Sequence, residues 1–244
     1  MRLRIDKDFI SMFDERNGHY FRSGTIKDGA ETKEDPFMSS FPELLDVGIM
    51  GHCAHGRSGL CVAAGVECYQ DGLHADAPNM ALEDFEEIVR QCQGNTYQIA
   101  LGGCGDPEQH EHFGEILVAC RVAGIVPNFT TSGLGLNSEL AKLCRKYCGA
   151  VAVSWYRSSY TLRAIDLLLQ AGVKTNIHYV VSNSTIEEAM ARLKGGGRWT
   201  CDPTASRRRG TAQFSRISGI TFAKAVPAVN TGWRVWGAAP SAGR

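Results

Sequence analysis

The fold and the candidate site both depend on one stretch of sequence, Asp46-Val-Gly-Ile-Met-Gly-His-Cys-Ala-His-Gly-Arg-Ser-Gly-Leu-Cys-Val-Ala-Ala-Gly-Val-Glu-Cys-Tyr-Gln70. It begins as an apolar run typical of a buried strand and continues as a glycine-rich loop that carries Cys53, Cys61 and Cys68. Thiolates bind zinc and iron–sulfur clusters, and glycines allow a loop to fold tightly around a small group. Because a closed structural zinc site takes four ligands, three thiols favour a metal centre with one open position.

The loop alone leaves three interpretations open. The three thiols could hold an iron–sulfur cluster, or they could bind zinc with His52 or His55 as the fourth ligand. Free cysteine also packs as a small hydrophobe, so a chain with nine cysteines could bring three together without a metal. The spacing of seven and six residues matches no common zinc pattern.

Beyond this loop, short β-rich runs alternate with apolar residues at helical spacing. The predicted strands cover residues 45–50, 97–101, 125–129, 150–155 and 174–181. The predicted helices cover residues 82–92, 113–120, 140–147, 162–169 and 186–193, the last preceded by a capping box at 184–187. Five strand–helix units predict an α/β fold with a parallel sheet, either a partial (β/α) TIM-like barrel or a doubly wound sheet. In both architectures the chemistry lies at the carboxyl ends of the strands.

The two ends of the chain differ from this regular part. Residues 1–44 predict a short hairpin with loops. Residues 195–244 contain eight Lys and Arg but one acid, a net charge of +7, which leaves −7 on residues 1–194. This basic tail has three interpretations: a disordered tail, an arginine-rich nucleic-acid contact, or a segment translated out of frame. We favour the last, because the tail is rich in arginine, alanine and glycine and contains no glutamate.

Length and cysteine content bound the class of protein. A chain of 244 residues can bury one substantial core. It opens without a secretory signal and contains no apolar run of about 18 residues, so we expect a soluble protein with no membrane partner. Nine cysteines, an odd number, favour a reducing compartment over a disulfide framework, which predicts a cytoplasmic location.

A second glycine-rich turn ends the second predicted strand, with the sequence Gly102-Gly103-Cys104-Gly105-Asp106-Pro107. Glycines let backbone groups approach a ligand closely, although the same residues could simply form a tight turn. Its place after a strand and before a helix favours the ligand-binding interpretation.

With this turn in place, residues 45–194 resemble the radical S-adenosylmethionine (radical SAM) superfamily. The resemblance is carried by the cysteine loop, by Gly103–Pro107 with His110 and Phe113, by residues 125–133, by Val151–Ser154 with Tyr160–Gly172, and by the run containing Asn176 and His178. The turn is similar to the family's glycine-glutamate-proline motif, with Asp106 at the glutamate position. The family's usual cysteine gaps are three and two residues, shorter than the gaps here. A longer loop can still deliver three thiolates, since each doubling of loop length costs only about 0.6 kcal/mol.

The resemblance implies a reaction. Cys53, Cys61 and Cys68 would hold a 4Fe-4S cluster whose fourth iron binds S-adenosylmethionine. Reductive cleavage would then give a 5′-deoxyadenosyl radical that abstracts hydrogen from an unknown substrate, with an electron donor such as flavodoxin or ferredoxin. The family commonly has six strand–helix units, where five are recognisable here. The alternatives are a non-catalytic zinc-binding α/β protein, an inactive truncated homologue, and a nucleic-acid-binding module that uses the basic tail, which we do not favour.

The resemblance also implies the residues that contact S-adenosylmethionine. They are the backbone at Gly103, Cys104 and Gly105 with Asp106 for the methionine amino group, Ser154 and Arg163 for its carboxylate, and Thr131, Ser132, Asn176 and His178 for ribose and adenine. Ser154 could instead be a polar strand residue, and Arg163 a helix-surface charge. Cys144 and Cys148 lie one helical turn apart and could bind an auxiliary metal, but packing is the favoured interpretation.

Overall fold

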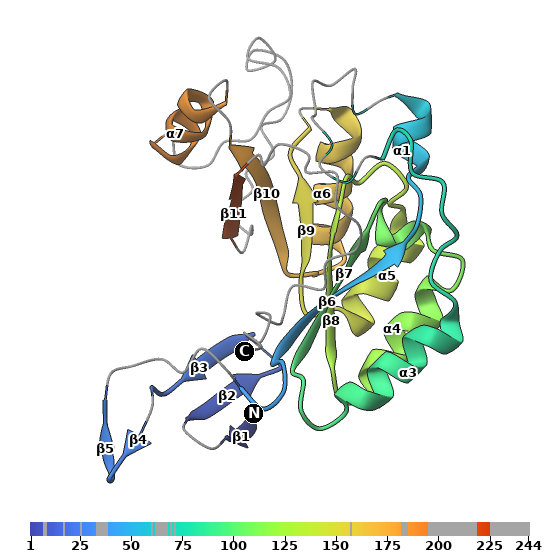
Figure 1. Ribbon diagram of the computed structural model, residues 1–244. Helices are drawn as coiled ribbons and strands as arrows, with labels where there is room; N and C mark the ends of the chain where they lie inside the picture. Colours follow the sequence, from blue (N-terminus) through green and yellow to red (C-terminus); the bar gives the residue numbers. More distant parts are fainter. Residues whose placement is uncertain are drawn as a thin grey trace, which may run out of the picture.

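The computed structural model contains a parallel sheet flanked by helices, with a small antiparallel sheet beside its lower end (Figure 1). It describes residues 1–6, 9–16, 18–24, 26–32, 39–59, 61, 68, 70, 72–156, 158–181, 185–194 and 219–224.

The parallel sheet has six strands in the order β11-β10-β9-β8-β7-β6. The strands are β6 (Leu44–Met50), β7 (Gln98–Gly103), β8 (Val126–Thr131), β9 (Val151–Ser154), β10 (Thr175–Val181) and β11 (Gly219–Lys224). Every neighbouring pair is parallel, as strand–helix–strand crossovers require. The sheet runs in sequence order and stays open between β6 and β11, so the predicted partial barrel is confirmed.

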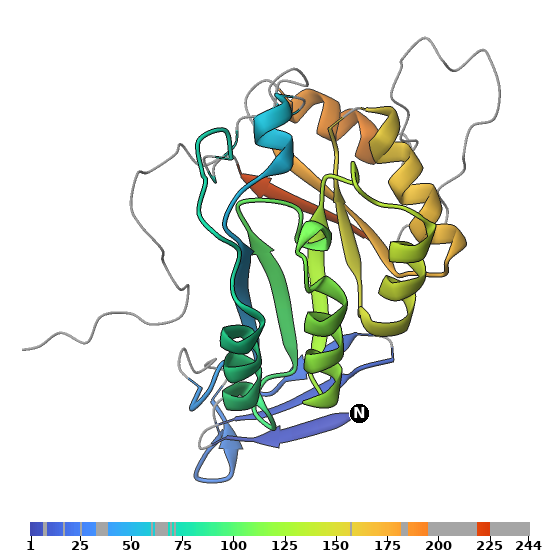
Figure 2. The same ribbon diagram turned by 90° about the vertical axis from the view of Figure 1, so that its right-hand side faces the viewer.

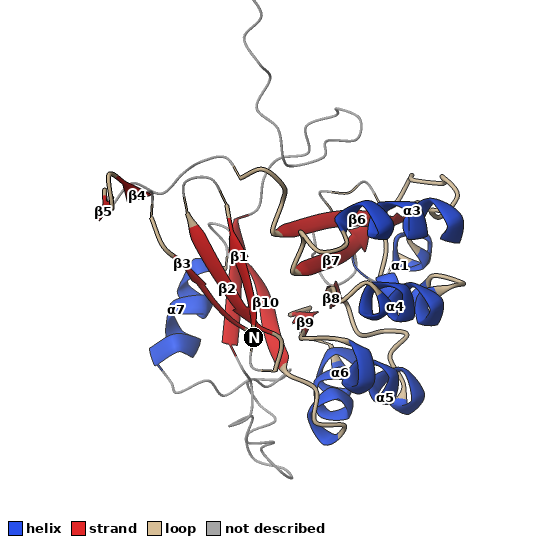
Figure 3. Ribbon diagram, turned by 90° about the horizontal axis from the view of Figure 1, so that it is seen from below, coloured by secondary structure: helices blue, strands red, loops and turns tan. Residues whose placement is uncertain are grey.

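Five helices follow the strands. They are α3 (Leu82–Cys92), α4 (Phe113–Val122), α5 (Ser138–Tyr147), α6 (Ser159–Gln170) and α7 (Ile186–Lys194). Helices α3 to α6 lie along one face of the sheet (Figure 2), and α7 packs beside β10 (Figure 3). In the described part of the chain, no helix is long and apolar enough to cross a membrane.

The core forms where the predicted helical stripes meet the sheet. Phe85 from α3 and Ile165 from α6 are fully buried, as are Ile49 and Ile99 from the two first strands of the sheet. Full burial of each such side chain stabilises the fold by about 1.5–3 kcal/mol. The apolar spacing therefore identified the inward faces of α3 to α6 correctly. In α7 the predicted apolar side is only partly right, because Ala189 is buried but Ile186 and Met190 are exposed.

A sixth strand, β11, comes from the segment that we expected to be a low-order tail. It pairs with β10 along six residues, from Asn176 opposite Gly219 to Val181 opposite Lys224. This pairing supplies the strand that the five predicted units lacked. The rest of the tail, and Ser184 of the predicted capping box, lie outside the described residues, so the frame-shift interpretation stays a prediction.

The N-terminal region is larger than the predicted hairpin. It forms a three-stranded antiparallel sheet of β1 (Arg2–Ile5), β2 (Ile10–Asp14) and β3 (His19–Arg22), with a small hairpin of β4 (Ile26–Lys27) and β5 (Ala30–Glu31). The sheet is anchored where Phe13 stacks on Tyr97, with ring centroids 5.4 Å apart. Because Tyr97 precedes β7, this contact fastens the small sheet to the amino-terminal end of the barrel strands.

The cysteine loop contains a short helix, whereas the sequence predicted only a glycine-rich loop here. Helix α1 (Ala54–Ser58) begins at Cys53, whose Sγ accepts a hydrogen bond from Gly56 N at 3.3 Å, and ends at Gly59 in the left-handed conformation with φ 69°. The Cys53 thiol takes the place of the usual side-chain oxygen at the N-cap, and a left-handed glycine ends the helix in the usual way. The first cysteine is thereby held at the carboxyl end of β6.

Replacing Gly103 by alanine should destabilise the fold. Gly103 has φ +114°, and a Cβ there would lie 2.4 Å from Met50 O and 2.7 Å from Met50 N. We expect the free energy of unfolding in urea to fall by about 3 kcal/mol or more, because backbone strain and overpacking add. Gly94→Ala is the control, since Gly94 has φ +83° with nothing within 4 Å and should cost only about 1–2 kcal/mol. Equal losses of unfolding free energy in Gly103→Ala and Gly94→Ala would contradict the close approach of β6 and β7 at Gly103.

Candidate functional site

The turn after β7 lies directly against the end of β6 and the start of the cysteine loop. Cys104 N donates to Met50 O at 2.8 Å, and a Cβ on Gly105 would lie 2.5 Å from His52 O. Glycine is required at 103 and 105 because two backbones approach each other at the carboxyl edge of the sheet. The glycine-rich turn and the cysteine loop, about 50 residues apart in the chain, therefore form one structure.

Asp106 is the centre of a buried polar network at this edge. One carboxylate oxygen accepts the Ser132 N–H at 2.7 Å, and the other accepts the Ser132 hydroxyl. His55 Nε2 lies 3.1 Å from Asp106 Oδ2 and 2.6 Å from Ser132 Oγ. All three side chains are buried. The network joins α1, the turn after β7 and the turn after β8, so it fixes the cysteine loop relative to two strand ends.

Cys53 and Cys68 approach each other around Gly72. Gly72 N donates to Cys68 Sγ at 3.3 Å, and a Cβ on Gly72 would lie 3.2 Å from Cys53 Cβ, 3.3 Å from Cys68 Sγ and 3.4 Å from Cys104 O. The absence of a side chain at Gly72 keeps this space open. The structure thus brings the first and third cysteines of the loop to one place beside the turn after β7.

Cys61 lies near the same region. Burial, with smaller electrostatic contributions from Cys53, Asp106 and Cys68, raises the pKa of its thiol to about 11. Burial also raises the pKa of Cys53, with smaller contributions from Asp106 and Cys68. These mutual effects place the three thiols and Asp106 within electrostatic range. Among the described residues, however, no three His, Cys, Asp or Glu side chains stand close enough together to coordinate a metal ion.

Glu108 is a buried carboxyl two residues beyond Asp106, in the single turn of 3₁₀-helix η1 (Pro107–Gln109). Its Oε1 accepts the Thr131 hydroxyl, while Oε2 has no hydrogen-bond partner among the described residues. Burial and, to a smaller extent, the nearby Asp106 carboxylate raise the pKa of Glu108 to about 8. Thr131, one of the implied nucleoside contacts, is therefore engaged with Glu108 and with Gly133 N.

The raised pKa of Glu108 predicts a loss of stability as pH rises. The unfolded carboxyl titrates near pH 4.3, so between about pH 4.3 and 8 the folded state binds the extra proton. The free energy of unfolding should fall by about 1 kcal/mol per pH unit between pH 6 and 8 from this group. Glu108→Gln should flatten that slope in urea unfolding, whereas Glu83→Gln, at an exposed position on α3, should leave it unchanged. An unaltered slope in Glu108→Gln would show that Glu108 ionises normally.

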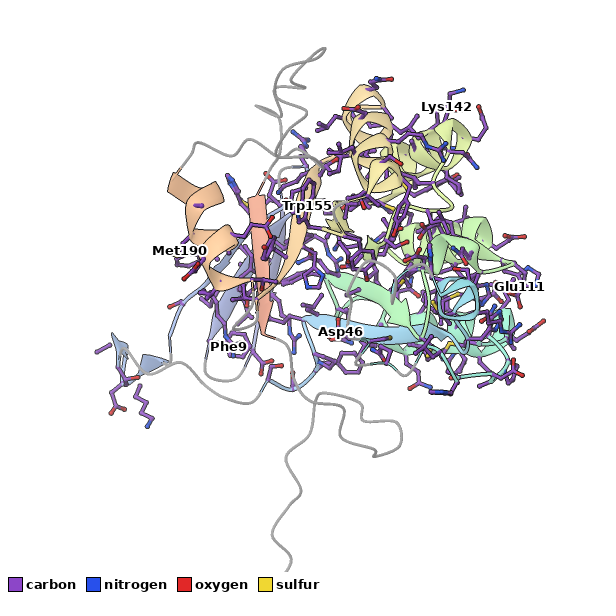
Figure 4. The ribbon with its side chains drawn as sticks, turned by 90° about the horizontal axis from the view of Figure 1, so that it is seen from above. Phe9, Asp46, Glu111, Lys142, Trp155 and Met190 are labelled. Carbon is purple, nitrogen blue, oxygen red and sulfur yellow. The ribbon has the colours of Figure 1, made fainter. Side chains whose placement is uncertain are left out.

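The carboxyl end of β9 and the middle of β10, which pair at Ser154 and His178, supply a second polar group. Ser154 Oγ lies 3.4 Å from His178 Nδ1, and burial lowers the pKa of His178. Trp155, labelled in Figure 4, extends the pairing by donating its backbone N–H to His178 O at 2.9 Å. The side chain of Tyr156 hydrogen-bonds Ser154, and burial raises the pKa of its phenol, with further contributions from Cys61 and Asp106. Ser154 and His178 thus lie together at the edge that carries the cysteines.

Two implied contacts lie apart from this group. Arg163 is exposed on α6, and among the described residues no hydrogen bond or ion pair joins it to Asp106, Ser132 or Ser154. Asn176 is half-buried near the start of β10, opposite Ala152. Both assignments stay predictions, and the placement of Arg163 agrees with its alternative interpretation as a helix-surface charge.

Three site residues were missed or misjudged from the sequence. His55 was considered only as a zinc ligand, but its Nε2 contacts Asp106 and Ser132. Tyr156 was overlooked although it follows a predicted strand, the position at which functional side chains gather. Glu108 was overlooked because an acid near a helix start is usually exposed, and only the packing of η1 against β8 buries it.

Cys144 and Cys148 belong to the core. Cys144 is fully buried in the main hydrophobic cluster. A hydrogen bond with Cys144 and burial raise the pKa of Cys148. The eight cysteines in the described part of the chain form no disulfides, which fits packing of this pair as neutral thiols.

Solved structures of known proteins share this fold. Streptococcus suis SuiB bound to S-adenosylmethionine has a TM-score of 0.50 at 18% identity, over 64% of this chain and 36% of that chain. SuiB bound to its precursor peptide SuiA has a TM-score of 0.56 at 14% identity, over 79% of this chain and 58% of that chain. Histidine-tagged anSMEcpe with bound AdoMet has a TM-score of 0.50 at 17% identity, over 72% of this chain and 55% of that chain.

These similarities establish the fold. SuiB and anSMEcpe are radical SAM enzymes, so the chain has the radical SAM fold that its sequence resemblance predicts. It spans between 36% and 58% of the length of these three chains. No protein-family model and no curated protein matches the sequence.

Proposed function

We propose that this protein is a radical SAM enzyme that binds a 4Fe-4S cluster through Cys53, Cys61 and Cys68. One observation carries the proposal: within a radical SAM fold, the cysteine loop meets the Gly103–Asp106 turn at the carboxyl edge of the sheet. Two of the structures that share this fold, one of SuiB and one of anSMEcpe, contain bound S-adenosylmethionine. A site for that molecule in this chain would lie at the same edge, where parallel barrels place their chemistry.

The chemistry of the donor set, three thiols on one loop, suits a cluster with one open iron, although in the described residues they do not stand at coordinating distances. Cys68 Sγ and Cys53 Cβ border the space beside Gly72, which a side chain at that position would fill, and Cys61 interacts electrostatically with both cysteines. Of the two candidate fourth ligands of a zinc site, His52 has its Nδ1 3.3 Å from Ala77 O, and His55 has its Nε2 engaged with Ser132 and Asp106 while its Nδ1 has no hydrogen-bond partner among the described residues. A three-thiolate site leaves one position for an exogenous ligand, whereas a structural zinc site would need a fourth protein ligand.

When bound, the cluster supplies the electron that cleaves S-adenosylmethionine to methionine and a 5′-deoxyadenosyl radical, which abstracts hydrogen from the substrate. The protein's own residues position the reactants. Asp106, held by Ser132, would fix the turn whose backbone meets the methionine amino group. Ser154 and His178 would present hydrogen-bonding atoms on the neighbouring strands. The buried side chains at this edge would keep water from the radical.

Two partners complete the proposal. One is the substrate from which the radical would abstract hydrogen. An external one-electron donor such as flavodoxin or ferredoxin would reduce the cluster. The sheet has the six strands that the family commonly has, because β11 covers the edge of β10 that would otherwise expose unpaired backbone groups.

Metal and sulfide analysis tests the cluster assignment. The full chain is reconstituted without oxygen, and iron, acid-labile sulfide and zinc are measured together with the EPR spectrum of the reduced protein. We expect iron and sulfide in a ratio near one, and an EPR signal that changes when S-adenosylmethionine is added. Zinc without iron or sulfide would contradict the proposal and favour the zinc-binding alternative.

A further inference from the structure

A basic pocket lies at the opposite end of the barrel from the cysteines. Its volume is about 520 Å³, within the range of small-molecule sites. Its walls come from the β2–β3 turn, the last turns of α4 and α5, and the segments that lead into β9 and β10. The charged side chains in these walls are Arg16, Arg121, Arg145, Lys146, Lys174 and the single acid Glu15. Because these segments precede strands rather than follow them, the pocket is separate from the proposed cluster site.

The concentration of positive charge is unusual for this chain. Residues 1–194 carry a net charge of −7 with 18 Lys and Arg, and five of these bases line this pocket. Lys and Arg at helix C-termini have an ordinary structural role, because each helix end carries about half a negative charge. Three helices, α4, α5 and α6, end here. Their ends contribute about −1.5 and Glu15 contributes −1, so a surplus of about +2.5 remains.

Two glycines in or beside the walls of the pocket let basic side chains lie close against the backbone. Gly172 has φ +77°, and a Cβ there would lie 3.4 Å from Arg145 Nε. Gly18 has φ +72°, and a Cβ there would lie 3.1 Å from Lys174 Nζ. Glycine at both turns satisfies the left-handed backbone and leaves room for the charged groups. One cation is held in place, since Arg121 Nε donates to Tyr147 O and Arg121 Nη1 lies 3.8 Å from the Glu15 carboxylate.

We infer that this pocket binds a small molecule that carries a phosphate ester or diphosphate group. A surplus of two to three positive charges matches the charge of a phosphate ester, a dianion, or of a diphosphate ester, a trianion. Three of the five cations are arginines, whose planar guanidinium groups bind phosphate oxygens in pairs. Leu169 and Val173 add an apolar wall for the rest of the molecule. This site is independent of the cluster and of the radical chemistry.

Isothermal titration of the full chain with inorganic pyrophosphate tests the inference. The ionic strength is held constant with sodium chloride, so that non-specific screening is the same throughout. We expect saturable binding by the unmodified protein and at least about tenfold weaker binding by Arg145→Gln, which removes one charge-assisted contact. The matched control is Lys142→Gln on the same helix, where an exposed Lys142 pairs with Glu139 outside the pocket. That variant should bind within about twofold of the unmodified protein.

Several outcomes would overturn the inference. One is the absence of saturable pyrophosphate binding in a chain that unfolds cooperatively. Another is equal weakening by Arg145→Gln and Lys142→Gln, which would indicate general charge attraction. Binding of a hexaglutamate peptide without binding of pyrophosphate would point to an acidic protein segment instead. None of these results depends on cluster loading, so they leave the proposed radical chemistry untouched.

Discussion

Cys53→Ala is expected to abolish cluster binding and, with it, cleavage of S-adenosylmethionine. Cys53 is the first proposed ligand, and it also caps α1 through the Gly56 N–H. Loss of one of three thiolates leaves only two protein ligands for the cluster. We expect iron and sulfide after reconstitution to fall about tenfold or more. Cys61→Ala and Cys68→Ala should give the same result.

Cys104→Ala is the matched control for these variants. Cys104 lies at the same edge, and its Sγ contacts Gln70 O at 2.8 Å, but it is outside the proposed ligand set. Only its backbone is assigned to S-adenosylmethionine, so its replacement should leave the iron and sulfide content nearly unchanged. If Cys104→Ala lost the cluster while Cys61→Ala kept it, the ligand assignment would be wrong.

Asp106→Ala is expected to lower the affinity for S-adenosylmethionine about 100-fold while the cluster is retained. The variant removes the acceptor of two Ser132 hydrogen bonds, and each buried donor left without a partner costs about 1–3 kcal/mol. The turn that would meet the methionine amino group then loses its fixed position. The measurement is equilibrium binding of S-adenosylmethionine to the reconstituted variant, with its iron content determined in parallel.

Two further variants separate charge from folding. Asp106→Asn keeps an acceptor for Ser132 N–H but loses the negative charge, and it should fall between Asp106→Ala and the unmodified chain. Asp84→Asn, at an exposed position on α3, should bind normally. Normal binding of S-adenosylmethionine by Asp106→Ala would remove Asp106 from the proposed site.

The strands and helices were largely predictable because their patterns are local. The apolar spacing from Leu82 to Cys92 repeats over three turns, and it predicted the bounds of α3 without error. Helix α1 was not predictable in the same way, because Gly56 and Gly59 weaken a helix signal and five residues are too few for periodicity. Its start depends on a thiol cap, which is not among the usual capping residues.

The hydrogen bonds within the site could not be predicted from the sequence, because they join residues that are far apart in the chain. His55 and Ser132 are 77 positions apart in the sequence, and only the folding of the sheet brings His55 Nε2 to 2.6 Å from Ser132 Oγ. The position of Asp106 was predictable from its motif, but its two hydrogen bonds to Ser132 were not. The N-terminal sheet shows the same limit: its third strand is stabilised by packing against Tyr97, which no local pattern in residues 1–44 reveals.

The central claim is most directly tested by the fate of S-adenosylmethionine. The full chain is reconstituted without oxygen, reduced with dithionite, and incubated with S-adenosylmethionine, and 5′-deoxyadenosine and methionine are measured by chromatography. The proposed function predicts equal amounts of both products, dependent on the reductant and lost in Cys53→Ala. A protein that carries a full 4Fe-4S cluster, binds S-adenosylmethionine and still forms no 5′-deoxyadenosine would contradict it.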